Sequence, residues 1–163
     1  MLNLDSFKIN INPLFNTYWT QIYINNEPLI ELVRQAEEPF VKAEIKQRRA
    51  RGDDIDEVTF PPGDYSYLPA SIVLLPSRNF LDQPWNHGFI LEPDDPEIGK
   101  SIVLDCTCGN PGCWFMQVRI TLNKSTVIWS EFSQFHRDWK LDLGPFTFDR
   151  KQYEAELSKP NYE

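Results

Sequence analysis

The stretch SIVLDCTCGNPGCWFMQVRITLNKSTVIWSEF, residues 101–132, decides the fold of this chain. Residues 101–106 and 114–122 alternate in apolar side chains, which is typical of β-strands with one buried face. The dipeptide NK at 123–124 then turns the chain into a third apolar run, 125–132. The sequence therefore predicts a β-meander in which each strand pairs antiparallel with the next.

The register of the second and third strands follows from their apolar residues. A turn of even length pairs Val118 with Trp129 and Ile120 with Val127. Both apolar sets then lie on the same face of the sheet, because a shift by one residue would reverse one of them. We therefore expect an antiparallel hairpin with Trp129 in the core.

The segment CTCGNPGCW, 106–114, joins the first two strands and contains all three cysteines of the chain. Its NPG triplet at 110–112 predicts a turn, since proline fixes φ and glycine accepts a positive φ. The hairpin, more than the C-x-C-x₄-C spacing, brings the thiols of Cys106, Cys108 and Cys113 close together.

A histidine is expected beside this loop. In the register above, Gln134 lies opposite Cys113, so His136 falls one or two residues beyond it. Three thiols and an imidazole are a known set of ligands for structural zinc. The candidate metal ligands are Cys106, Cys108, Cys113 and His136.

Three interpretations of the cysteine loop remain open. It is a structural turn with small buried thiols, a metal site, or a redox or nucleophilic centre with His136 as base and Asp138 as its orienting group. The spacing lacks the paired C-x-x-C knuckles of zinc fingers, which favours the structural turn over the metal site. His87 is expected to be a loop histidine.

Two further strands and a helix are expected in the first half of the chain. Residues 7–12 and 18–24 are rich in β-branched and aromatic side chains, with a turn at Pro13 between them. Apolar residues then recur at helical spacing from residue 28, and Pro39 should kink or end this helix near 37–38. A second, polar helical piece is predicted over 40–50, and residues 71–75 fit a short strand or a buried turn.

The C-terminal region predicts one more strand and a helix. Residues 146–148 (FTF) fit a strand, and Asp149 is a suitable N-cap for a helix that buries Tyr153 and Leu157. The sequence thus predicts a single α+β domain over residues 1–163. We expect an antiparallel sheet of four to six strands, with helices from 28–50 and 149–159 packed on one face.

Composition and charge exclude several classes of protein. The chain has 163 residues, 41% of them hydrophobic and 25% charged, which is the balance of a folded domain. Its net charge of −8 disfavours binding to nucleic acid or to an anionic membrane surface. No stretch resembles a membrane span or a secretory signal, and three clustered cysteines do not fit a secreted disulfide scaffold. We therefore expect a cytoplasmic protein.

Several motifs together resemble those of a family of small uncharacterised bacterial proteins. The shared pattern is C-x-C-G-x-x-G-C, then V-x-W-x-x-F, then a terminal F-x-F-x-x-x-x-Y; the matching segments here are CTCGNPGCW, TVIWSEF and FTFDRKQYEAEL. The resemblance covers residues 103–157 best and implies no particular activity. The matched positions are Cys106, Cys108, Gly109, Gly112, Cys113, Val127, Trp129 and Phe132.

The sequence favours a non-enzymatic binding or regulatory protein, of the kind that inhibits or neutralises a basic protein partner. The acidic segments 92–97 and 53–57 would form the face for that partner. In the stretch 46–57, a basic run precedes the acidic residues. We interpret it as a solvated helix end. The aromatic and charged residues after the last meander strand are the candidate binding residues: Phe135, His136, Arg137 and Trp139.

The alternative is a metal- or thiol-dependent enzyme centred on the 106–113 loop and His136. No catalytic signature such as a P-loop or H-E-x-x-H supports it. Zinc is the one cofactor that the residues suggest.

Overall fold

The computed structural model describes residues 3–54, 60–110 and 112–160 and contains two antiparallel sheets. The first has the order β1-β2-β3, with β1 (Phe7–Leu14), β2 (Thr17–Ile24) and β3 (Glu27–Pro28). The second is a meander in sequence order, with β4 (Ser101–Leu104), β5 (Met116–Leu122), β6 (Thr126–Gln134) and β7 (Phe146–Asp149). The α+β class is confirmed, but the strands form two sheets where one was expected.

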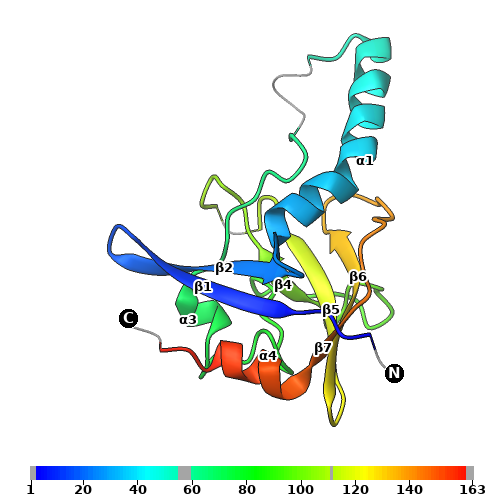
Figure 1. Cartoon of the computed structure of the whole chain (residues 1–163). Coiled ribbons are helices and arrows are strands. Elements are labelled where there is room, and N and C mark those ends of the chain that lie inside the picture. Colours follow the sequence, from blue (N-terminus) through cyan, green and yellow to red (C-terminus); the bar gives the residue numbers. More distant parts are fainter. Residues whose placement is uncertain (1–2, 55–59, 111, 161–163) are drawn as a thin grey trace.

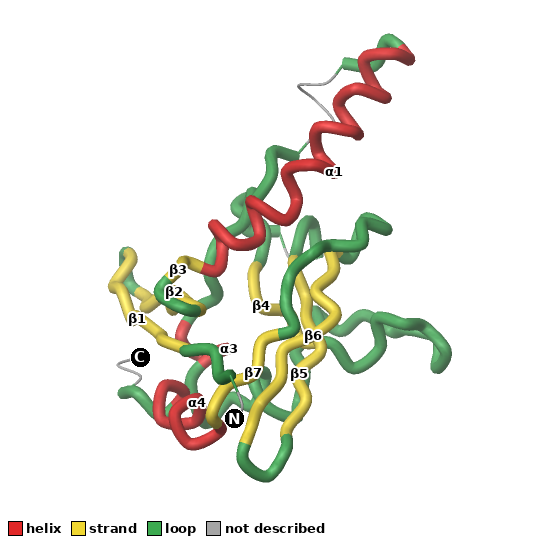
Figure 2. The backbone as a smooth tube through the Cα atoms, turned by 45° about the vertical axis from the view of Figure 1, so that its right-hand side comes forward, coloured by secondary structure: helices red, strands yellow, loops and turns green. Residues whose placement is uncertain are grey.

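Within the described residues, three helices accompany the sheets: α1 (Leu29–Arg51), α3 (Ala70–Val73) and α4 (Arg150–Leu157). Helix α4 packs against β1, β6 and β7 and so joins the two sheets. The first half of α1 lies against β2 and β3, whereas its second half projects away from the body (Figures 1 and 2). The helices therefore cover different parts of the sheets instead of sharing one face.

The core forms where α4 and β1 meet the meander. Trp129 is fully buried between the rings of Phe7 and Phe80, whose centroids lie 5.6 and 5.4 Å away. Its indole Nε1 donates to the hydroxyl of Tyr153 at 3.0 Å, and that hydroxyl donates to the carbonyl of Phe80 at 2.6 Å. The predicted core position of Trp129 is confirmed.

The C-terminal helix also forms as predicted. The Asp149 carboxylate accepts a hydrogen bond from the backbone N–H of Gln152 at 2.9 Å, which satisfies one of the unpaired donors at the helix start. Tyr153 and Leu157 are completely buried. This helix then holds the first strand, because Glu156 accepts from Ile9 N–H at 2.7 Å.

Of the two outcomes expected at Pro39, a kink or an end of the helix, the end is wrong. The helix runs through Pro39 for 23 residues, and the separate piece over 40–50 is its second half. Contacts on both sides of the proline hold the helix together. Before it, Glu37 accepts hydrogen bonds from Gly63 N and Tyr65 OH; after it, Phe40 stacks on Trp139 at 5.9 Å. These tertiary contacts offset the hydrogen bond that proline removes.

The hairpin of β5 and β6 exists, but its register differs from the expected one by two residues. Ile120 lies opposite Trp129, and the loop between the paired residues Leu122 and Val127 has four residues, 123–126, where two were expected. The shift is an even number of residues, so the apolar residues of both strands still lie on the same face of the sheet. This two-residue shift and a bulge further along together bring Gln134 opposite Met116 instead of Cys113.

Two smaller expectations also need correction. Residues 71–75, expected as a strand or turn, lie mostly in the short helix α3. Pro13 belongs to β1, and the turn follows at Phe15, which has a positive φ of 56°. In the 46–57 run, residues 46–51 form the end of α1; residues 55–59 lie outside the described part of the chain.

Candidate metal centre

The cysteine loop connects β4 to β5, and backbone hydrogen bonds to Ser66 anchor its start. Ser66 and Asp105 exchange backbone hydrogen bonds of 2.8 and 3.0 Å at the point where β4 ends. The loop then turns at Gly109 and Gly112, whose φ angles of 80° and 77° favour glycine. A Cβ at Gly112 would lie 2.8 Å from the ring of Phe89, so a larger residue here would displace that ring.

The three cysteines converge at this loop. The Sγ atoms of Cys106, Cys108 and Cys113 all lie within 4.8 Å of one another, and all three thiols are free. Cys106 is buried, whereas Cys108 and Cys113 are exposed, so a solvent ion can reach the cluster. In the described part of the chain this is the one group of three or more such side chains with the spacing of a metal site.

The thiols perturb one another's acidity. Burial raises the pKa of Cys106 to about 12, and hydrogen bonds to the other two cysteines contribute. The hydrogen bond with Cys106 lowers the pKa of Cys108, and the N–H of Asn110 acts in the same direction. The hydrogen bond with Cys108 raises the pKa of Cys113. The cluster thus favours one thiolate at Cys108, and a bound cation would stabilise all three as thiolates.

His136 lies against the loop but is not among the clustered ligand atoms. Its Nε2 is 2.7 Å from the carbonyl oxygen of Gly112, an acceptor, so Nε2 carries a proton and donates. The ring is parallel to Trp114, with centroids 6.4 Å apart. The register differs from the expected one, and His136 contacts the end of the cysteine loop through the backbone of Gly112.

The other candidate binding residues are half-buried and pack into the fold. Phe135 stacks on Phe115 and Phe89, with centroids 4.9 and 5.0 Å apart. Arg137 places its guanidinium 4.9 Å from the centre of Trp114 and forms an ion pair with Glu44 at 2.8 Å.

Trp139 continues this packing. Its ring lies edge-on to Trp114 and stacks on Phe40 of α1. Together with Arg137, it attaches α1 to the segment after β6.

One residue beside the cluster was not selected from the sequence. The side chain of His87 is only 5% exposed, and its Nε2 lies 3.3 Å from Asp105 Oδ1. The same carboxylate oxygen accepts from the N–H of Cys106 at 2.9 Å. The only sequence signal was the neighbouring Gly88, which indicates a turn without showing where the ring would lie.

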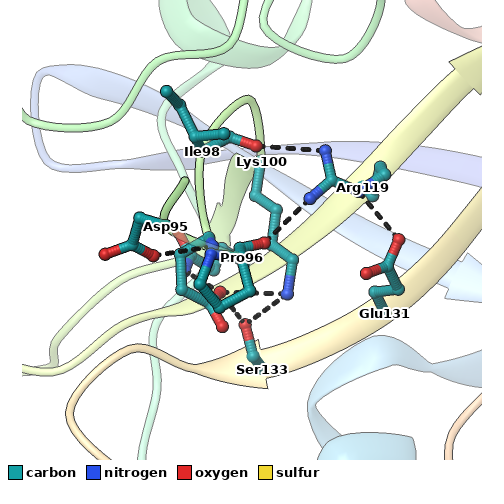
Figure 3. Close-up of polar contacts among 9 residues, drawn as sticks. Asp95, Pro96, Ile98, Lys100, Arg119, Glu131 and Ser133 are labelled. Atoms are coloured by element: carbon teal, nitrogen blue, oxygen red, sulfur yellow. Dashed lines mark hydrogen bonds and ion pairs between the residues drawn. The ribbon is translucent and has the colours of Figure 1, made fainter. Parts of the chain in front are cut away.

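The acidic loop 92–97 is held in one conformation by the meander (Figure 3). Arg119 donates to the carbonyls of Pro96 and Ile98 at 2.9 and 3.0 Å. Glu97 forms an ion pair with Lys100 at 2.9 Å, while the carboxylates of Glu92 and Asp94 lie on exposed residues. Glu92 and Asp94 therefore present negative charge to solvent, while the end of the loop is hydrogen-bonded to the meander.

Comparisons with known proteins supply no assignment. No family model, no curated protein and no solved structure matches this chain. Among the helices that the structure describes, none combines the length and apolar character needed to cross a bilayer.

Proposed function

We propose that this protein binds one thiophilic metal ion, zinc in the cell, through the thiolates of Cys106, Cys108 and Cys113. The observation that carries the proposal is the clustering of three Sγ atoms within 4.8 Å. In a tetrahedral zinc site with Zn–S bonds of about 2.3 Å, the sulfurs lie about 3.8 Å apart. The thiols therefore need to move by no more than about 1 Å to hold the ion.

The loop is suited to this role because its two ends are already fixed. Ser66 holds the first end through Asp105, and the imidazole of His136 holds the second end through the Gly112 carbonyl. A site with fixed ends loses less entropy when the ion binds. The fourth position is then left to water or to an external ligand.

The contacts of His136 favour a binding or regulatory role over a Cys–His enzyme, whereas the open fourth metal position is also what a zinc-dependent enzyme would need. A Cys–His enzyme needs an unprotonated imidazole nitrogen aimed at the thiol. The Nε2 of His136 instead donates to a backbone carbonyl, and Arg137 beside it is engaged with Glu44. The exposed carboxylates of Glu92 and Asp94 favour a basic protein as the partner.

The test is the metal content of protein purified without chelators. We expect one zinc per chain, and loss of that zinc in Cys106→Ser, Cys108→Ser and Cys113→Ser. His136→Ala should still bind one zinc, but more weakly, because this ring holds the loop backbone and does not contact the ion. Absence of metal, together with three thiols that react freely with a disulfide reagent after zinc addition, would overturn the proposal.

A further inference from the structure

A cavity of about 640 Å³ lies at the junction of the first sheet, the start of α1 and the cysteine loop. Strands β1 and β2 form one wall, and residues 65–67 form another. The third wall consists of Cys106, Thr107 and Gly109. Sites for small molecules have volumes of about 300–1,000 Å³ and commonly lie where structural units meet.

Hydrogen bonds hold two aromatic walls of this cavity in place. The hydroxyl of Tyr65 donates to the buried carboxylate of Glu37 at 2.5 Å. The hydroxyl of Tyr67 accepts from the N–H of Ile30 in the first turn of α1 at 3.3 Å. Because both rings are fixed, a ligand would find the cavity formed before it binds.

The lining is aromatic and neutral. Trp19, Tyr65 and Tyr67 contribute rings, and neutral side chains such as Gln21 and Thr107 contribute hydrogen-bonding groups. None of the described lining residues carries a charge. An ionised ligand would lose its hydration here without gaining a counter-charge, which disfavours anions and cations alike.

We propose that this cavity binds a neutral small molecule that contains an aromatic ring and a few hydrogen-bonding groups. The ring would lie against the aromatic side chains, and the polar groups would contact the amide and hydroxyl side chains. The cavity shares Cys106 with the proposed metal centre but does not include the exposed thiols of Cys108 and Cys113. Dye binding and zinc content are measured separately, so the two proposals can be told apart.

Two dyes with the same aromatic rings test the proposal. N-phenyl-1-naphthylamine is neutral, and 8-anilinonaphthalene-1-sulfonate adds one negative charge. With the zinc-loaded full chain, we expect saturable fluorescence of the neutral dye at one site, and binding of the sulfonate at least about tenfold weaker. Equal affinities, or no fluorescence increase with the neutral dye while zinc is bound, would overturn the cavity proposal and leave the metal proposal intact.

A blocking variant locates the site. Gln21→Trp places a large ring in the cavity on a strand that accepts aromatic residues, and should abolish dye binding. Gln47→Trp, the same change on an exposed part of α1, is the matched control and should bind the dye as the parent does. Dye binding that survives Gln21→Trp in folded protein would overturn the assignment.

Amide chemical shifts provide a second measurement that needs no variant. On addition of the neutral dye, we expect the largest changes at Trp19, Tyr67 and Gly109. The largest changes at the exposed pair Phe89 and Ile90 would instead show surface adsorption and would contradict the proposal.

Discussion

At the scale of single residues, Trp129 combines the largest buried ring with a buried hydrogen-bond chain. Trp129→Ala removes both the packing and the donor to Tyr153. We expect a loss of about 3–5 kcal/mol in the free energy of unfolding, measured by chemical denaturation. Trp139→Ala, a half-buried control, should cost less; an unchanged midpoint for Trp129→Ala would remove this residue from the core.

Glu37 is a buried carboxyl group whose two oxygens accept hydrogen bonds from Gly63 and Tyr65. Burial raises the pKa of Glu37 above its ordinary value of 4.5, so the folded state binds the proton more tightly than the unfolded state does. The stability that protonated Glu37 contributes is fully present below pH 4.5. It is lost as the pH rises through the pKa of Glu37 in the folded state.

Glu37→Gln should therefore gain stability relative to the parent as the pH is raised from 4 to 8. Urea denaturation of both proteins at several pH values measures this difference. Glu38→Gln, the adjacent and partly exposed carboxylate, controls for the change in net charge. A difference between Glu37→Gln and the parent that does not change with pH would contradict the account.

At the scale of elements, the register differs from the expected one for two reasons, the four-residue loop after β5 and a bulge in β6. Glu131 has a φ of 55°, a conformation that costs a non-glycine residue about 1–2 kcal/mol. Its carboxylate pairs with Arg119, which also holds the 96–98 backbone. The four-residue loop leaves the alternation intact, whereas the bulge shows in the sequence as a three-residue step between the buried Trp129 and Phe132.

The positive φ of Glu131 predicts how glycine at this position would change the stability of the protein. Both Glu131→Gly and Glu131→Ala remove the ion pair with Arg119, but only glycine relieves the positive φ. We expect Glu131→Gly to be more stable than Glu131→Ala by about 1 kcal/mol, as measured by thermal unfolding. In an ordinary strand position alanine is the more stable of the two, so that order would show that the bulge is absent.

The sequence was sufficient where local patterns and tertiary packing agree. The strands of the meander, the Asp149 cap and the burial of Tyr153 and Leu157 all follow from alternation or helical spacing. The continuation of α1 through Pro39 did not follow, because Glu37 and Phe40 find partners that lie far away in the chain. Local propensity is overridden where such contacts hold both sides of a helix.

At the scale of the whole molecule, the candidate site depends on segments that no local pattern connects. The convergence of the three cysteines was predictable, since one hairpin carries them all. The Ser66–Asp105 pairing, the buried His87 and the cavity beside Thr107 were not, since they require the first sheet and the 64–67 segment to meet the meander. The sequence thus located the chemistry of the site but not its surroundings.

The coordination of zinc in the purified protein is the most direct test of the central claim. X-ray absorption at the zinc edge reports the number and type of atoms bound to the ion. We expect three sulfur atoms at about 2.3 Å and one lighter atom at about 2.0 Å. A zinc ion surrounded only by oxygen and nitrogen would show binding elsewhere on the surface and would contradict the assignment of Cys106, Cys108 and Cys113.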